Sequence, residues 1–151
     1  MALSFTDLTP EGKKYFQELQ KLANLEIQVG FQAGEAKEDS GTDIVDIAVY
    51  NEYGSSDTPA RPFLRQSFER HPDQLQAGCD MVNQTISNGG SAEEGLEKLG
   101  VMCKGLVQQE IVDGGFAPNK ESTIKKKGSS QPLIDTGTMR QSVNYVIKQR
   151  T

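Results

Sequence analysis

The sequence predicts an α+β fold, in which a small antiparallel sheet drawn from the N- and C-terminal strands packs with several helices. Apolar residues recur at helical spacing through most of the first 114 residues. They alternate with polar residues in "LEIQVGFQA" near the N-terminus and in "SVNYVIKQR" at the C-terminus, as in half-buried strands. Because no internal repeat or linker interrupts the chain, we expect residues 1–151 to form a single domain.

The first helix is predicted to begin at Thr9, with Pro10 at its first helical position, and to end near residue 24. Its apolar stripe consists of Phe16, Leu19, Leu22 and Ala23. The strand predicted over residues 25–33 follows at once. Residues 34–43 then contain no apolar side chain larger than alanine, which predicts a mobile acidic loop.

Asp43 is predicted to cap a short helix that ends at Tyr53. One side of this helix carries Ile44, Ile47, Ala48 and Asn51. The next segment, "SSDTPARP", contains two prolines and is predicted to be an extended connector. The helical pattern resumes at Pro62, and a further helix is predicted from Pro72 to about Ser87.

A capping box, Ser91 with Glu94, predicts the start of the next helix, which should end at the glycines after Asp113. Its predicted buried stripe is Leu96, Leu99, Met102 or Cys103, Leu106 and Val107. Residues 116–132 are polar and lysine-rich, so we expect a second mobile loop with a short helix at residues 121–126. The triplet Asp135-Thr136-Gly137 is then expected to turn the chain into the final strand.

The overall composition indicates a soluble protein made in the cytoplasm. The formal net charge of −5 argues against a general nucleic-acid binder, although it allows DNA to slide past without being gripped. No signal peptide or membrane span is expected. Cys79 and Cys103 lack the spacing of a metal or redox site and are predicted to be buried free thiols.

The triplet Asp135-Thr136-Gly137 also resembles the catalytic loop of an aspartic protease. Aspartic proteases are almost wholly β, whereas several helical patterns precede Asp135 here, and too few residues follow it for a flap. Arg140 would also lower the carboxyl pKa that this mechanism needs raised. His71, the only histidine, precedes Pro72 and is interpreted as a helix-entry residue. We therefore predict no enzyme activity, no metal and no cofactor.

Two segments are more specific than any of these patterns. Residues 47–68 read "IAVYNEYGSSDTPARPFLRQSF", and residues 116–147 read "FAPNKESTIKKKGSSQPLIDTGTMRQSVNYVI". Together, in this order, they resemble the neck and tail-completion (head–tail joining) proteins of tailed bacteriophages. The matching positions are Ala48, Asn51, Glu52, Tyr53, Gly54, Pro59 to Phe63, Thr123, Lys126 to Gly128, Pro132, Leu133, Thr136, Gly137, Met139 and Ser142. Lys127 departs by one residue from the strict spacing of that family.

This resemblance implies a virion structural protein without catalysis or cofactor, assembled as a ring where the head meets the tail. A hexamer is the first expectation and a dodecamer the second. Its partners would be the head-side connector or adaptor and the tail tube or terminator proteins, and DNA would pass through without specific binding. A tail terminator or a head-closure protein of the same joint is the close alternative. A small cytosolic protein–protein adaptor is the alternative of another class.

The resemblance and the local chemistry also suggest interface residues. Arg61 and Arg65 flank Phe63, and an aromatic ring beside arginines is typical of interface anchors. The alternative is that Phe63 packs in the core and both arginines are solvated. The other interface residues expected from the motifs are Asn51, Glu52, Asp135, Thr136, Met139 and Arg140. We further expect the two loops, near residues 34–43 and 116–132, to become ordered on assembly.

Overall fold

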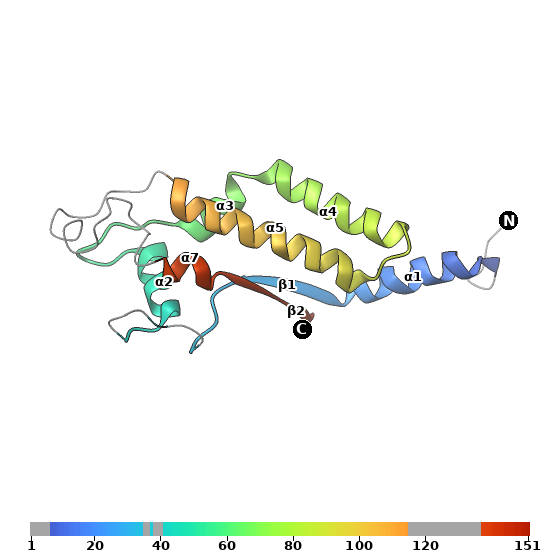
Figure 1. Ribbon diagram of the computed structural model, residues 1–151, viewed down its shortest axis with the longest axis horizontal. Coiled ribbons are helices and arrows are strands. Elements are labelled where there is room, and N and C mark those ends of the chain that lie inside the picture. The colour runs from blue at the N-terminus through green and yellow to red at the C-terminus, as the bar shows by residue number, and fades with distance from the viewer. Residues whose placement is uncertain (1–6, 35–36, 38–40, 115–136) are drawn as a thin grey trace. The chain divides into compact units, whose positions relative to one another are not determined.

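The computed structural model describes residues 7–34, 37, 41–114 and 137–151. Within these ranges six helices and a two-stranded antiparallel sheet are present, which confirms the predicted α+β class (Figure 1). In chain order the elements are α1 (Pro10–Ala23), β1 (Leu25–Gly30), α2 (Ile44–Tyr53), α3 (Phe63–Glu69), α4 (Pro72–Ser87), α5 (Ala92–Asp113), α7 (Thr138–Ser142) and β2 (Asn144–Gln149).

The chain divides into two compact units, each with its own apolar core. Unit 1 comprises Met1–Gln28, Asp73–Met102 and Val146–Thr151, and unit 2 comprises Val29–Pro72 and Cys103–Tyr145. The predicted short helix at residues 121–126 lies outside the described residues.

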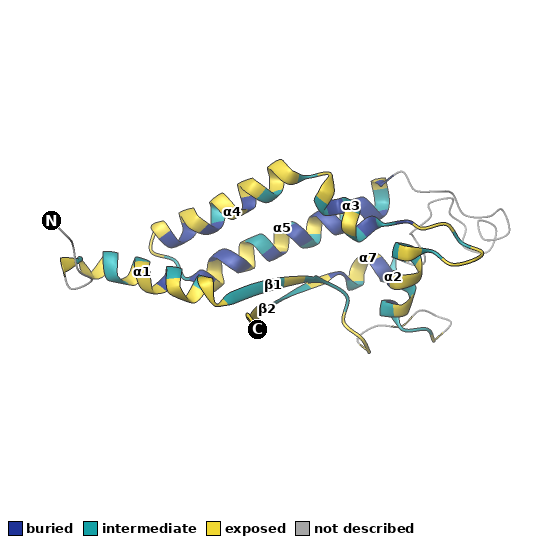
Figure 2. Cartoon of the chain, turned by 180° about the vertical axis from the view of Figure 1, so that it is seen from behind, coloured by how far each residue is buried: buried dark blue, intermediate teal, exposed yellow. Residues whose placement is uncertain are grey.

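In unit 1, α4 and the first half of α5 form a helical hairpin (Figures 1 and 2). Glycines bring the two helices close together. A Cβ atom added to Gly78 would lie 2.5 Å from Cε of Met102, and one added to Gly95 would lie 2.9 Å from a methyl group of Val82. The predicted cap is present, because the hydroxyl of Ser91 accepts the backbone N–H of Glu94 at 3.0 Å. The core of this unit is Val82, Ile86 and Ala92.

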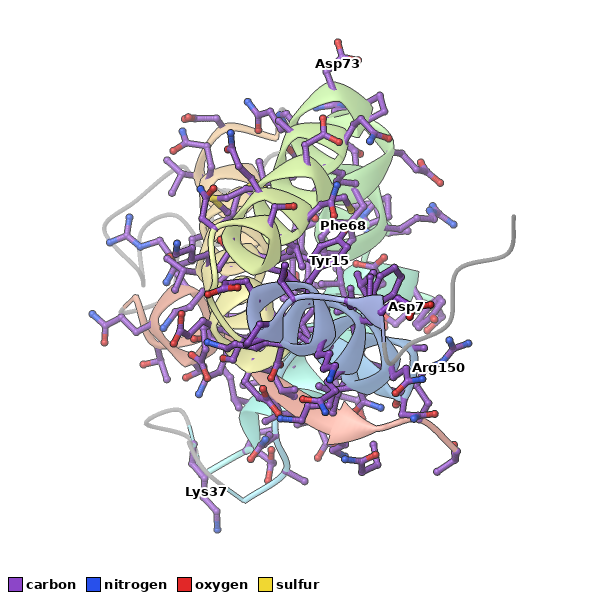
Figure 3. The ribbon with its side chains drawn as sticks, turned by 90° about the vertical axis from the view of Figure 1, so that its right-hand side faces the viewer. Asp7, Tyr15, Lys37, Phe68, Asp73 and Arg150 are labelled. Carbon is purple, nitrogen blue, oxygen red and sulfur yellow. The ribbon has the colours of Figure 1, made fainter. Side chains whose placement is uncertain are left out.

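The helix α1 begins as predicted, with the Thr9 hydroxyl accepting the backbone N–H of Gly12 at 3.1 Å. Its buried side differs from the prediction. The residues that pack against the unit 1 core are Tyr15, Leu19 and Leu22, with Tyr15 labelled in Figure 3. Phe16, which the apolar pattern placed on the buried side, is 45% exposed, and Ala23 is exposed as well. Phe16 follows Tyr15 and is therefore turned about 100° away from the packed stripe.

The sheet consists of β1 paired with β2, as the two alternating segments predicted. Beyond the strand ends, the backbone N–H of Arg150 donates to the carbonyl of Asn24 at 2.8 Å, and its guanidinium donates to the carbonyl of Ala23 at 3.3 Å (Figure 3). β1 ends earlier than the sequence predicts, and β2 starts later. β1 stops at Gly30 instead of residue 33, and β2 starts at Asn144 because α7 takes the preceding residues.

In unit 2 the core is formed by α2, α3, the second half of α5, α7 and the residue after it. Its buried members are Ile44, Ala48, Phe63, Val107, Ile111, Met139 and Val143. The sequence analysis missed α7. Gly137 precedes it in the left-handed conformation, with φ of 80°, and the helix then turns Met139 inward. A helix of one turn is too short to show a hydrophobic period, so pattern alone could not separate it from a turn.

Cys103 is buried, as predicted, but Cys79 is exposed, so the prediction of two buried thiols is wrong for Cys79. Across the described part of the chain, none of the helices has the length and apolar character needed to cross a bilayer.

Candidate functional site

The two family-like segments are residues 47–68 and 116–147, and their described parts meet on α2, within unit 2. Residues 47–68 supply most of α2, the connector and most of α3, whereas residues 137–147 supply α7 and the start of β2. The helix α2 contacts both α3 and α7. Segments that are far apart in the sequence therefore pack together around α2. Asp135, Thr136 and residues 116–132, where the sequence predicts a loop, lie outside the described residues.

The connector after α2 turns tightly at Gly54, which has φ of 75°. A Cβ atom at this position would lie 2.7 Å from the backbone nitrogen of Ala60 and 2.9 Å from the carbonyl of Thr58. Only glycine fits this turn, for both conformational and steric reasons. The returning chain is held where the backbone N–H of Arg61 donates to the carbonyl of Asn51 at 2.6 Å. The Asn51 side chain donates in turn to the carbonyl of Ile47 at 2.9 Å.

Glu52 joins α2 to the start of α3. Its carboxylate accepts the backbone N–H of Leu64 at 2.9 Å and that of Arg65 at 3.1 Å. Pro62, at the N-cap position of α3, makes no side-chain cap bond, so Glu52 satisfies these otherwise unpaired N–H groups from a distance in sequence. Together, Asn51, Glu52 and Gly54 fix the corner between the two helices. Their spacing thus has a structural reason within the subunit.

Phe63 and Met139 both lie in the core of unit 2. Phe63 is 1% exposed and Met139 is 2% exposed. The ring of Phe63 packs edge-to-face against Phe31, with ring centres 5.9 Å apart. The sequence allowed Phe63 to be either an interface anchor or a core residue, and in the structure it is a core residue. In the structure described, neither side chain presents surface to a neighbouring protein.

The three arginines expected at the interface differ in exposure. Arg61 is buried, and this burial lowers the pKa of its guanidinium. Arg65 is exposed and makes a long ion pair with Glu69, 3.8 Å between Nε and Oε1. Arg140 is exposed on α7, and its backbone carbonyl accepts the side-chain amide of Gln108 at 3.1 Å. Arg65 and Arg140 therefore remain available to a partner, whereas Arg61 is buried in the subunit.

The outer face of α2 carries large apolar side chains that the sequence analysis did not select. Val49 is 46% exposed, Tyr50 is 61% exposed and Tyr53 is 77% exposed. Exposed positions appear in yellow along this helix in Figure 2. Tyrosines are enriched in protein interfaces because their rings are large and carry a polar end. A signal was present: these residues fall opposite the predicted buried side of α2, where polar residues are normally found.

A groove of about 310 Å³ runs beside this face. Its walls include Val29, Phe31, Val45, Val49 and Tyr53, and Glu52 is the one charged residue among the described groove residues. Because the carboxylate of Glu52 already accepts two backbone N–H groups, the groove is mostly apolar in character. Exposed apolar grooves of this kind are typical of surfaces that bind proteins, membranes or small ligands.

Asp43 joins the two ends of the acidic loop that the sequence predicts at residues 34–43. One carboxylate oxygen accepts the N–H of Val45 at 2.9 Å as the predicted cap of α2, and the other accepts the N–H of Gly34 at 2.7 Å. These two bonds, that from Val45 first, lower the pKa of the Asp43 carboxyl. The ends of the loop, residues 34 and 43, are thereby held together.

Chemistry-bearing side chains do not gather into a site in the described part of the chain. His71 stands directly before α4, as predicted, and its Nδ1 lies 2.7 Å from the carbonyl oxygen of Ser67. Since a carbonyl only accepts, Nδ1 carries the proton. Among residues 7–34, 37, 41–114 and 137–151, no three His, Cys, Asp or Glu side chains come together as metal ligands would.

Comparisons of the chain with protein-family models, with curated proteins and with solved structures find no match.

Proposed function

We propose that this chain is a virion structural protein of a tailed phage, which assembles as a ring at the head–tail joint and lets DNA pass through. The observation that carries the proposal is the meeting of both family-like segments on α2, beside an exposed apolar face. The motif resemblance suggests the place in the virion. The face formed by Val49, Tyr50 and Tyr53 supplies a surface for assembly.

The corner between α2 and α3 suits such a role because it is rigid. Three backbone or side-chain contacts of Asn51 and Glu52, together with the turn at Gly54, hold it. A surface that is already fixed in the free subunit loses little conformational entropy on binding. A closed ring needs two different patches on each subunit, and we expect a hexamer first and a dodecamer second.

The net charge of −5 fits a channel that DNA must cross. Tight binding to DNA comes from lysine and arginine side chains that neutralise phosphates. A ring with an acidic surplus would guide DNA without holding it. The partners in this proposal are the head-side connector or adaptor and the tail tube or terminator proteins.

The direct test is negative-stain electron microscopy of lysates from a phage that carries a deletion of this gene. We expect DNA-filled heads beside free tails, and whole particles after purified protein is added back. A Gly54→Ala protein, whose fold should be destabilised, should restore fewer particles. This variant shows whether restoration depends on the folded subunit. Intact infectious particles without the gene would overturn the proposal and favour the cytosolic adaptor. Filled heads that lose their DNA would favour head closure, and tails of irregular length would favour a terminator.

A further inference from the structure

The outer face of α2 combines apolar side chains with a negative charge. Asp46 lies one turn before Val49 and Tyr50 and two turns before Tyr53, so the four residues share one side of the helix. Asp46 is exposed, and α2 contains no basic residue. Within the described part of the chain, its carboxylate makes no hydrogen bond or ion pair. This face is therefore apolar, acidic and unpartnered.

A face of the opposite charge lies on α1, in unit 1. Phe16 is 45% exposed and is held edge-to-face by Tyr15, with ring centres 5.5 Å apart. Lys13 lies one turn before Phe16 on the same side of the helix, and Gln20 lies one turn after it. No partner of the Lys13 ammonium occurs among the described residues, whereas Lys14 donates to the carbonyl of Gly89.

We infer that the Phe16 face of one copy docks into the α2 groove of the next copy, with Lys13 paired to Asp46 across the contact. This inference rests on the proposed ring and names the two surfaces that would join its subunits. Phe16 would enter the groove beside Tyr53 and Val45. The contact would repeat from copy to copy.

The size of the groove suits this occupant. A cavity of about 150 Å³ is enough to hold a benzene molecule, and the groove measures about 310 Å³. Its apolar walls match a phenyl ring, and burying such a ring in an interface is a strong contribution to affinity. The arrangement of charge matches too. Lys13 precedes Phe16 by three residues on α1, as Asp46 precedes Val49 by three residues on α2.

The two faces are different patches of the same chain, one in each unit, and a ring contact requires two different patches. A contact in which one patch meets a different patch is heterologous, and it closes into a ring when the rotation between copies permits. A dimer that uses one patch twice would bring two acidic α2 faces together and repel. Charge complementarity therefore favours the α1-to-α2 pairing over an α2-to-α2 pairing.

The first experiment uses two variants, Phe16→Ala and Tyr53→Ala, each defective on one side of the contact. Association is measured by sedimentation velocity of the free proteins and by restoration of whole particles in the deletion lysate. Each variant alone should associate about 30-fold more weakly than the natural protein, as expected for loss of one aromatic anchor. An equimolar mixture should form dimers and nothing larger, because one intact pair of faces remains.

The second experiment exchanges the charges. Lys13→Asp and Asp46→Lys should each weaken association roughly three- to tenfold at low salt, and less in high salt because ions screen the pair. The double variant, Lys13→Asp with Asp46→Lys, should regain most of the loss. The matched controls are Lys148→Asp and Asp80→Lys, which make the same charge changes at exposed positions of β2 and α4. They should associate like the natural protein.

The outcomes separate this inference from the proposed function. If the natural protein restores particles and the four face variants do so equally well, the docking inference is wrong and the neck function stands. Failure of the double charge variant to recover would also overturn the pairing. If the Tyr53→Ala protein forms normal rings but no longer binds another phage protein, the docking inference is wrong and the groove binds that protein instead. If deletion of the gene leaves intact particles, the proposed function fails first.

Discussion

At the corner after α2, three residues of the motif Asn-Glu-Tyr-Gly have a structural role within the subunit. Asn51 receives the returning backbone, Glu52 caps the next helix, and Gly54 makes the turn. Tyr53 is the member of this run that the subunit itself does not bury, since it is 77% exposed. The three structural residues therefore hold the exposed ring of Tyr53 at the end of α2, where the proposed assembly contact would use it.

We predict that Gly54→Ala destabilises the subunit by about 2 kcal/mol or more. The methyl group would clash with the backbone of Ala60, and the alanine would have to adopt the left-handed φ of 75°. The free energy of unfolding, from urea titration followed by circular dichroism, measures the effect. Gly105→Ala is the matched control, since a Cβ there meets no atom within 4 Å.

The control should act in the opposite direction. Gly105 lies on the exposed side of α5, and alanine is favoured over glycine in a helix by about 1 kcal/mol. Gly105→Ala should therefore raise the free energy of unfolding by up to that amount. Equal effects of the two substitutions would show that the tight turn at Gly54 does not limit stability.

At the scale of elements, a carboxylate links α1 to the start of α5. Glu18 is 6% exposed, and its Oε2 accepts the backbone N–H of Ala92 at 2.8 Å. Its Oε1 accepts the ammonium of Lys21 at 3.1 Å. The bond from Ala92, followed by that from Lys21, lowers the pKa of the Glu18 carboxyl. A negative charge at the start of a 22-residue helix is also favourable to the helix dipole.

This link predicts a pH dependence of stability. Because the pKa of Glu18 is lower in the folded state than the ordinary value of 4.5, the folded state binds fewer protons. The stabilisation is therefore complete above about pH 5 and is lost as the pH falls through the folded pKa. Glu18→Gln should reduce the slope of unfolding free energy against pH in this acid range. Asp43, whose pKa is lowered in the same direction, leaves part of the slope in place.

The same position offers a graded comparison at neutral pH. Glu18→Gln keeps an oxygen for the Ala92 N–H and should lose about 1 kcal/mol, because only the charge-assisted part of the bond disappears. Glu18→Ala leaves a buried N–H without its acceptor and should lose up to about 3 kcal/mol. Chemical denaturation at pH 7 distinguishes the two. If alanine is as good as glutamine, the bond to Ala92 contributes nothing to stability.

At the scale of the whole molecule, stability and assembly should depend on different side chains. Phe63→Ala opens the core of unit 2 and should lower the free energy of unfolding by about 3–5 kcal/mol. Tyr53→Ala removes an exposed ring and should change stability by less than about 0.5 kcal/mol. Thermal unfolding of the free subunits and particle restoration measure the two properties. A Tyr53→Ala protein that unfolds early, or that assembles normally, would contradict this separation.

The local elements of the fold were largely predictable because their signals are local. Thr9, Asp43 and Ser91, each predicted at the start of a helix, all accept a backbone N–H from the first turn of that helix. The span of α4 was predicted from Pro72 to Ser87, and it has those bounds. Caps, prolines and long hydrophobic periods act within a few residues, so they need no tertiary partner to be recognised. The one-turn helix α7 and the early end of β1 lacked such signals.

The sequence by itself determined the α+β class and the starts of the longer helices, and it suggested the proposed place at a phage joint. Only the tertiary structure decided which large side chains remain outside. It buried Phe63 and Met139, exposed Phe16 and Tyr53, and placed Glu18 under the start of α5. The physical reason is that the hydrophobic pattern fixes which residues are apolar, whereas burial depends on which surface another element covers. That covering comes from residues distant in sequence, and it is what leaves the α2 face open.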